Sequence, residues 1–182
     1  MNDIKVFDTG KKLSKELFLQ YYQLIEMSFP KCEHWSFAKH LEEFEDIRFH
    51  SLCYCPDGIK GFINYWELDG FVYIEHFAVT PELRGQGIGA GLMSELRHIV
   101  GEQCLVLEAE PPSDSAIAAR RIAFYQRLGF ALNDFDYLQP AMSDGESEVP
   151  LVIMSSPKTL SEAEYNVVRD VLYREIYKKT VK

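Results

Sequence analysis

The segment from Val79 to Met93 constrains this chain more than any other part of its sequence. It reads Val-Thr-Pro-Glu-Leu-Arg-Gly-Gln-Gly-Ile-Gly-Ala-Gly-Leu-Met, with alternating glycines at positions 85, 87 and 89. A predicted strand precedes it and a predicted helix follows it. Glycine adopts positive φ at little cost and lets the backbone approach a ligand closely. Because a helix N-terminus offers unpaired N–H groups and the positive end of a dipole, this strand, bend and helix predict an anion-binding loop.

Two familiar phosphate loops do not fit this segment. A Walker loop requires Lys-Ser or Lys-Thr after its last glycine, but Gly89 is followed by alanine and glycine. A dinucleotide fingerprint requires Gly-x-Gly-x-x-Gly at a first βα turn, whereas 85–89 has another spacing and lies mid-chain, after an apparent antiparallel meander. What remains is the pattern Arg-x-x-Gly-x-Gly on Arg84, Gly87 and Gly89.

This pattern resembles the acyl-coenzyme-A pyrophosphate loop of the GNAT superfamily of N-acetyltransferases. The flanking segments also resemble that family: Tyr73–Pro81 its fourth strand, Leu105–Pro112 its fifth strand, and Arg120–Phe130, with its Phe-Tyr-x-x-x-Gly-Phe ending, its fourth helix. The resemblance extends from about Ile59 to Phe130. It implies an α/β (α+β) fold with a mixed, mostly antiparallel central sheet flanked by helices, here with an extra C-terminal helix.

The periodicity predicts the individual strands. An antiparallel meander is expected because turn signals at 56–58 and at Asp69-Gly70 separate apolar runs. The strand before the glycine loop and the strand after the crossover helix are expected to be parallel neighbours. The predicted strands are 4–7, 48–55, 59–68, 71–79, 103–109, 130–138 and 149–154.

Helix starts are predicted from capping residues. Ser14 and Ser36 precede the first two helices, the second of which is expected to turn Leu41, Phe44 and Ile47 inward. Ser113 or Asp114 is expected to cap the helix after the fifth strand. A Ser-x-x-Glu capping box at 161–164 predicts a last helix through about residue 177.

Length and composition bound the remaining possibilities. The chain has 182 residues and 47% hydrophobic residues, which predicts one packed domain over 1–182. No segment has the length of a membrane span and no signal-peptide pattern is present, so we expect a cytoplasmic protein without a membrane partner. The net charge of −9 argues against a nucleic-acid partner. A homodimer remains open. Cys32, Cys53, Cys55 and Cys104 lack metal-site spacing, so reduced thiols and no metal are expected.

Acetyl transfer to an amine requires proton removal, because an alkyl amine with a pKa of about 10.4 is almost fully protonated at neutral pH. The resemblance implies that Glu75 is the base, since polyamine-type members have a carboxylate there. Burial would raise its pKa. A structural glutamate paired with a lysine or arginine is the alternative. His76, expected to face away from Glu75, and water remain the competing proton acceptors.

The resemblance also supplies the other site residues. Tyr125 corresponds to the family tyrosine near the coenzyme sulfur and is expected to donate to the departing thiolate; the alternative is a core tyrosine. Arg120 or Arg121 is expected to hold a coenzyme phosphate, because Ala118 stands where the family often has an asparagine. The residues expected to bind the cofactor are Phe77, Ala78, Val79, Arg84, Gly85, Gln86, Gly87, Ile88, Gly89, Ala90 and Arg121.

These expectations together predict an N-acetyltransferase that transfers acetyl from acetyl-CoA directly to a primary amine of a small molecule or peptide. The alternative is a non-catalytic acyl-CoA-binding or regulatory module on the same fold. Acidic residues in the second helix and in the loop 139–148 favour a cationic acceptor, although they could equally be solvated surface charges. These residues are Glu42, Glu43, Glu45, Asp46, Asp144, Glu146 and Glu148.

Overall fold

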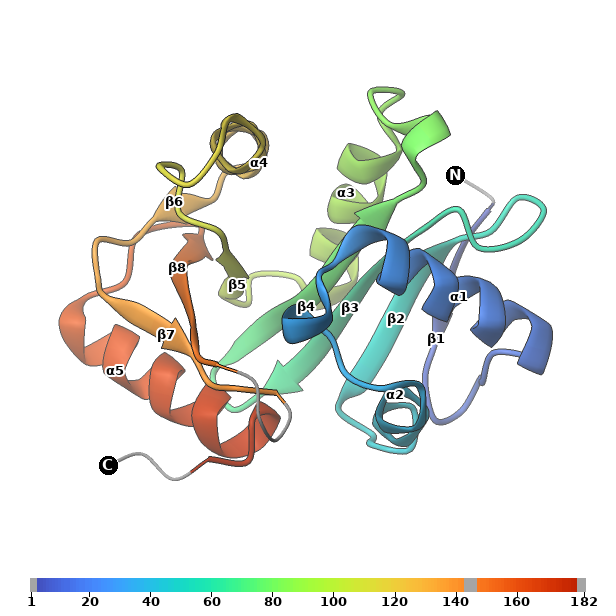
Figure 1. Cartoon of the computed structure of the whole chain (residues 1–182), viewed down its shortest axis with the longest axis horizontal. Coiled ribbons are helices and arrows are strands. Elements are labelled where there is room, and N and C mark those ends of the chain that lie inside the picture. Colours follow the sequence, from blue (N-terminus) through green and yellow to red (C-terminus); the bar gives the residue numbers. More distant parts are fainter. Residues whose placement is uncertain (1–2, 143–146, 180–182) are drawn as a thin grey trace. The chain divides into compact units, whose positions relative to one another are not determined.

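The computed structural model describes residues 3–142 and 147–179 (Figure 1). The chain forms two compact units, Met1–Gln103 and Cys104–Lys182. The expected single domain and the expected parallel strand pair both span the two units, and they stay predictions. No helix within the described ranges is both long and apolar enough to cross a membrane.

The first unit contains the predicted antiparallel meander. Its strands are β1 (Ile4–Phe7), β2 (Phe49–Tyr54), β3 (Gly61–Leu68) and β4 (Phe71–Val79), and each pairs antiparallel with the next. The bounds of β1 and β4 agree with the prediction. Gly70, with φ of 89°, makes the turn between β3 and β4, where a residue with a side chain would be strained.

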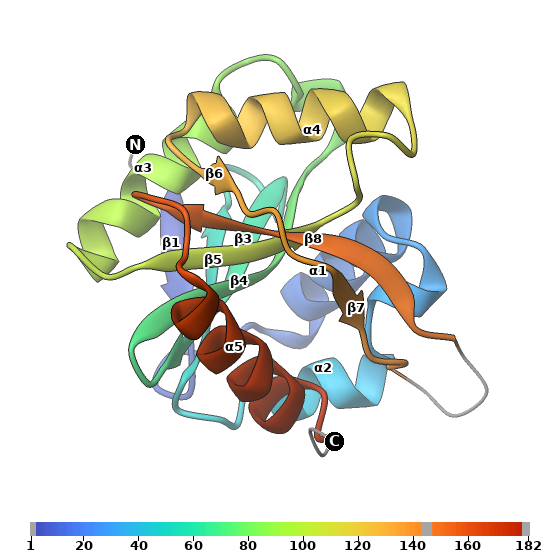
Figure 2. The same cartoon turned by 90° about the vertical axis from the view of Figure 1, so that its left-hand side faces the viewer.

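Three α-helices accompany this sheet. They are α1 (Lys15–Ser28), α2 (Phe37–Glu43) and α3 (Ile88–Val100), with short 3₁₀ helices at Lys31–Glu33 and Pro81–Leu83. The predicted caps are confirmed, because the Ser14 and Ser36 hydroxyls each accept an N–H from the first helical turn. In Figures 1 and 2, α1 and α2 cover one face of the sheet and α3 covers the other.

A β-bulge interrupts β4 at Glu75. Asn64 pairs with His76 while its neighbour Tyr65 pairs with Ile74, so Glu75 is the extra residue. A bulge breaks the alternation of side chains along a strand. Contacts described below place the side chains of both Glu75 and His76 on the face covered by α1 and α2. The expectation that they face opposite ways is therefore wrong.

The buried face of α2 also differs from the prediction. Leu41 and Ile47, expected inward, are 44% and 77% exposed, whereas Phe44 is buried as predicted. His40 and Glu43 occupy the inner face and are 0% and 4% exposed. A polar face can be buried only when its groups find hydrogen-bonding partners. These partners come from other segments of the chain. The local hydrophobic pattern therefore predicted the wrong buried face for this helix.

The second unit is built around a long strand. This strand, β8 (Val149–Ser156), pairs antiparallel with β5 (Leu105–Ala109), β6 (Ala131–Leu132) and β7 (Tyr137–Gln139). The prediction of a single strand over 130–138 is therefore wrong, because two short strands, β6 and β7, form in this region. The predicted strand is broken at Asn133, whose amide donates to the Ile153 carbonyl and the Ser155 hydroxyl at 3.1 and 3.0 Å.

Two helices flank these strands on opposite sides, α4 (Ala116–Arg127) and α5 (Glu162–Val171), the latter continuing as a π-helix at Leu172–Ile176 (Figure 2). Ser115 caps α4 by accepting the Ala118 N–H at 3.0 Å, so the predicted caps one and two residues earlier are wrong. The capping box at 161–164 is present. The predicted α+β class, with mostly antiparallel strands and an extra C-terminal helix, is confirmed.

Candidate functional site

The glycine loop has the backbone conformation that its sequence predicts. Gly85 and Gly87 have φ of 76° and 83°, and Gly87 is the left-handed N-cap of α3. A Cβ atom built on either glycine would meet no heavy atom within 4 Å. Glycine is therefore favoured here by the dihedral angle rather than by crowding, and the space beside the loop is open.

The start of α3 fits an anion. No side chain caps the helix, and its first hydrogen bond runs from the Gly91 N–H to the Gly87 carbonyl at 2.9 Å. The amides of Ile88, Gly89 and Ala90 come earlier, so they have no carbonyl one turn before them within the helix. With the positive end of the dipole and the open glycine positions, these amides suit a pyrophosphate.

Side chains brace the loop against the end of β4. The Arg84 Nε donates to the Val79 carbonyl at 3.0 Å, and the Gln86 amide donates to the Glu82 carbonyl at 3.0 Å. Arg84 is exposed and directly precedes Gly85 in the chain. Along the end of β4, Ala78 is buried and its neighbours Phe77 and Val79 are half-buried.

Tyr125 lies on the buried face of α4. It is 7% exposed, and its ring centroid is 5.8 Å from that of Phe130. Burial raises the pKa of Tyr125 to about 12, and nearby Arg121 opposes this rise. The hydroxyl is therefore protonated at neutral pH. Arg121, expected to hold a coenzyme phosphate, pairs with Glu110 at 2.5 Å.

Glu75 is held by two tryptophan side chains. The Trp35 indole N–H donates to Oε1 at 3.1 Å and the Trp66 indole N–H donates to Oε2 at 3.0 Å. The Glu75 side chain is only 3% exposed. His76 lies beside it, with Nδ1 at 3.8 Å from Oε2, while Nε2 is 3.0 Å from the Glu33 carbonyl. The alternative interpretation of Glu75 as a structural glutamate assumed a lysine or arginine partner. Its hydrogen-bonding partners are instead the indoles of Trp35 and Trp66.

The ionisation of Glu75 differs from the expectation. Burial acts to raise its pKa, but the interaction with the neighbouring His76 and the Trp66 hydrogen bond outweigh it, so the pKa is lowered. Glu75 is thus an anion at neutral pH and a weak base. The expected rise in its pKa is wrong, because the indole and imidazole groups around the carboxylate favour its charged form.

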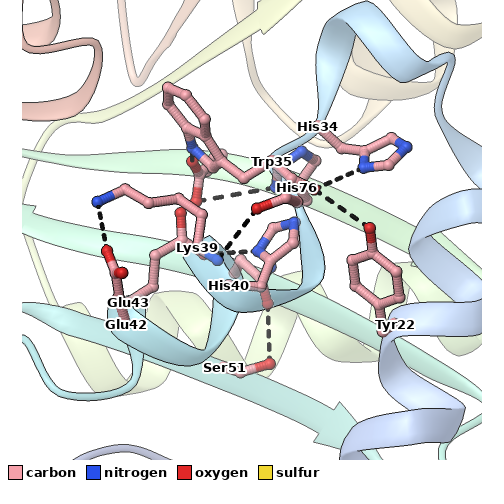
Figure 3. A network of polar contacts seen from close by, with 12 residues as sticks. Tyr22, His34, Trp35, Lys39, His40, Glu42, Glu43, Ser51 and His76 are labelled. Atoms are coloured by element: carbon pink, nitrogen blue, oxygen red, sulfur yellow. Dashed lines mark hydrogen bonds and ion pairs between the residues drawn. The ribbon is translucent and has the colours of Figure 1, made fainter. Parts of the chain in front are cut away.

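The network contains two residues that the sequence did not place there, His40 and Glu43 of α2 (Figure 3). His40 Nδ1 is 2.6 Å from Glu43 Oε2, and the charge of Glu75 acts on the Glu43 carboxyl. Burial and the charge of Glu75 raise the pKa of Glu43 well above its usual range. Burial and His76 lower the pKa of His40 to about 3. The only local signal was their i, i+3 spacing on one helix face.

A separate cluster in the second unit was also missed. The hydroxyls of Tyr137 and Tyr177 both donate to the carboxylate of Glu108 on β5, the Tyr177 bond at 2.5 Å. Burial and Glu108 raise the pKa of Tyr137 well above its usual range. These bonds tie β7 and the end of the C-terminal helix to β5, which gives the extra helix a structural role.

The acidic residues proposed to attract a cation are mostly engaged. Glu42 pairs with Lys39 at 3.0 Å, Glu45 pairs with Lys12, and Asp46 pairs with Arg48 at 2.7 Å. Glu43 is buried rather than facing a cleft. Asp144 and Glu146 lie outside the described residues, while Glu148 is exposed. The carboxylates around α2 therefore give little support to a cationic acceptor.

Comparison with known proteins decides the family. A sequence model described as "Acetyltransferase (GNAT) family" matches residues 15–130, which include the glycine loop, Glu75 and Tyr125. The chain belongs to the GNAT acetyltransferase family. The resemblance noted from the sequence is thereby confirmed, and the matched segment runs through both compact units.

Individual proteins similar to this chain are also acetyltransferases by their names. A solved "Putative acetyltransferase from GNAT family from Bacteroides thetaiotaomicron" is 34% identical, with a TM-score of 0.79 over 98% of this chain and 99% of that one. "Putative acetyltransferase YjbC" of Bacillus subtilis (strain 168) is 26% identical over 87% of this chain and 82% of its own length. An aminoglycoside 6'-N-acetyltransferase complexed with coenzyme A has a TM-score of 0.61 over 84% of this chain and 95% of that one; at 17% identity it shows the fold alone.

Proposed function

We propose that this chain is an N-acetyltransferase that transfers the acetyl group of acetyl-CoA directly to a primary amine of a small molecule or peptide. The observation that carries the proposal is the glycine loop opening α3, with left-handed Gly85 and Gly87, an uncapped helix start and open space beside both glycines. Membership in the GNAT family supplies acyl transfer as the reaction class.

In this proposal the amides of the loop hold the pyrophosphate of acetyl-CoA. The donors are the backbone N–H groups from Gly85 to Ala90, with the exposed Arg84 guanidinium beside them. Backbone groups of Phe77, Ala78 and Val79 take the pantetheine arm, as a peptide adds to a strand. Arg121 contacts Glu110 through Nη1, and its other guanidinium donors are proposed to hold a coenzyme phosphate.

The chemistry is direct aminolysis of a thioester. The amine nitrogen attacks the acetyl carbonyl carbon, a C–N bond forms, and the C–S bond breaks with its electron pair leaving on sulfur. The amine loses a proton to Glu75, His76 or water, and the thiolate takes up a proton from solvent to give the coenzyme A thiol. We assign Tyr125 to the departing sulfur. Because its pKa of about 12 exceeds that of an ordinary thiol, about 8.5, Tyr125 stabilises the thiolate by a hydrogen bond rather than by giving up its proton.

Glu75 is proposed as the carboxylate that draws the proton from the acceptor. Its lowered pKa means that it attracts positive charge without holding the proton tightly. His76, whose Nδ1 lies 3.8 Å away, and water remain the alternatives for the final proton acceptor. A cytoplasmic location, a cationic acceptor and a homodimer also stay predictions.

The test is release of free thiol from acetyl-CoA in the presence of a panel of primary amines, with and without the protein. We expect amine-dependent release that Tyr125→Phe slows while acetyl-CoA still binds. Binding of acetyl-CoA without turnover of any amine would instead support the alternative, a non-catalytic acyl-CoA-binding or regulatory module.

A further inference from the structure

Two carboxyl groups meet in one buried site within the first unit. Glu43 comes from α2 and Glu75 from the bulge in β4, and each side chain is 3% exposed. Two imidazoles whose ring centroids lie 5.5 Å apart link them: His40 Nδ1 is 2.6 Å from Glu43, and His76 Nδ1 is 3.8 Å from Glu75. Because two like charges in one buried site repel each other, the folded protein keeps a proton on one of the two carboxyl groups.

The surrounding groups decide which carboxyl keeps the proton. Glu75 accepts indole N–H groups from Trp35 and Trp66, which stabilise its negative charge. Glu43 faces Glu75 and the imidazole of His40. Two like charges in a buried site cannot both be stable, so the carboxyl with fewer donors holds the proton. That carboxyl is Glu43.

Other elements packed on the site do not change this assignment. From α1, the Tyr21 hydroxyl is bound by the Asn64 amide at 2.6 Å, and burial together with Glu43 and Glu75 raises the pKa of Tyr21 well above its usual range, so it is neutral. From β4, His76 faces Glu75. Further charged or titratable neighbours among the described residues are Lys39 and Glu42 on α2, which pair with each other, and His34, which stacks on His40. The ring of Tyr22 on α1 lies 5.8 Å from that of His40, and Cys53 on β2 acts on Tyr21.

His40 completes the arrangement. Its pKa of about 3 makes it neutral at physiological pH, and its Nδ1 lies 2.6 Å from Glu43 Oε2. Its Nε2 is buried and has no hydrogen-bond partner among the described residues. A charged imidazole would need a partner at both nitrogens. The His40 ring is therefore neutral in this environment. Its Nδ1 contact restrains the carboxyl of Glu43, which lies three residues further along the same helix.

We propose that Glu43 is a positioning residue of the acetyl-transfer site, which shares one proton with Glu75 and thereby keeps Glu75 as a single anion fixed between two indoles. The catalytic part of this inference rests on the proposed function. The shared proton does not depend on the proposed function, because it is a property of the folded protein without substrate. A link between α2 and the bulge of β4 follows directly from the shared proton.

The first test measures thermal stability against pH in the protein without ligand. The raised pKa of Glu43 means that the native state keeps a proton that the unfolded chain loses near its ordinary pKa of about 4.3. This stabilisation is fully present below that pH and is lost as the pH rises toward the native pKa. Glu43→Gln keeps a hydrogen-bond donor but has no proton to lose. We therefore expect the Tm of Glu43→Gln relative to wild type to rise steadily from about pH 5 upward, until the pH reaches the native pKa of Glu43.

The matched control is Glu42→Gln, the same charge change on the adjacent residue, whose side chain is 67% exposed and pairs with Lys39. Its Tm should follow the wild-type pH dependence. Parallel curves for Glu43→Gln and wild type would overturn proton sharing. If Glu43→Gln does not fold, Glu75→Gln gives the reciprocal test: removing the neighbouring charge should flatten the wild-type slope, and an unchanged slope overturns the proposal.

The second test measures kcat/KM against pH, corrected for the fraction of free amine. In wild type we expect an acid limb from Glu75 and a second inflection at higher pH, where the shared proton leaves. Glu43→Gln should keep the acid limb, lose the second inflection and leave the KM for acetyl-CoA unchanged. Identical profiles would overturn the positioning role. If wild type transfers acetyl to no amine, the proposed function fails, while the stability test still decides whether the proton is shared.

Discussion

Substitution of Gly87 offers a quantitative test of the anion-binding loop. Gly87 has φ of 83° and nothing within 4 Å of its Cβ position, so a longer side chain fits but the backbone is strained. The left-handed conformation costs a residue with a Cβ roughly 1–2 kcal/mol. Glu and Gln share this cost and nearly the same bulk, so Gly87→Glu and Gly87→Gln differ mainly in charge.

The charge difference sets the expected effect on binding. A carboxylate about 4 Å from a phosphate charge is repelled by roughly 1 kcal/mol in water and about 4 kcal/mol at a partly shielded protein surface. Gly87 is exposed, so salt screens part of this repulsion. Gly87→Glu should therefore bind acetyl-CoA about 5-fold to 10³-fold more weakly than Gly87→Gln at low salt. The ratio should shrink as ionic strength rises.

Isothermal titration calorimetry with acetyl-CoA measures this ratio, and a thermal melt confirms that each variant is folded. Gly70→Glu is the distant control. Gly70 also has a positive φ, 89°, and an open Cβ position, but it lies across the nine residues of β4 from the loop, roughly 30 Å away. Equal affinities for Gly87→Glu and Gly87→Gln, or an equal loss in Gly70→Glu, would refute the loop as the pyrophosphate site.

Three further substitutions test individual groups. Tyr125→Phe keeps the ring packing but removes the hydrogen bond to the departing sulfur, so it should lower kcat by on the order of 10²-fold with little change in acetyl-CoA affinity; a loss within about threefold would make Tyr125 a core residue only. Glu75→Gln should lower the rate at neutral pH with partial recovery at higher pH, where more free amine exists; a wild-type profile would remove Glu75 from the mechanism. The pKa of His40 falls from about 6.5 unfolded to about 3 folded, so wild type should lose up to roughly 5 kcal/mol of stability as the pH falls through this range. His40→Gln should lack this component of the acid slope, and equal slopes in chemical denaturation would contradict a buried neutral imidazole.

Local sequence signals predicted much of this fold correctly. Serine caps at 14, 36 and 161 were correct because capping depends on a side chain and its own helix turn. The hairpin at Gly70 and the bounds of β4 followed from turn chemistry and apolar alternation. The positive φ of Gly85 and Gly87 was likewise encoded in the residues that need it.

The interior of the candidate site could not be predicted in the same way. Nothing in the sequence around Glu75 signals the bulge that brings His76 to the same face, because register depends on pairing with β3. The polar face of α2 is buried because Glu43 meets a carboxylate from β4 and His40 meets Glu43. A hydrophobic pattern counts such residues as surface, since their burial depends on partners that are distant in the chain.

Transfer of a labelled acetyl group tests the central claim most directly. The full chain is incubated with isotope-labelled acetyl-CoA and a panel of neutral, anionic and cationic primary amines, and the products are identified by mass spectrometry. We expect an N-acetylated amine that carries the label, formed together with free coenzyme A and depending on Tyr125. Recovery of intact acetyl-CoA bound to the protein, with no labelled amine from any class of acceptor, would contradict this expectation.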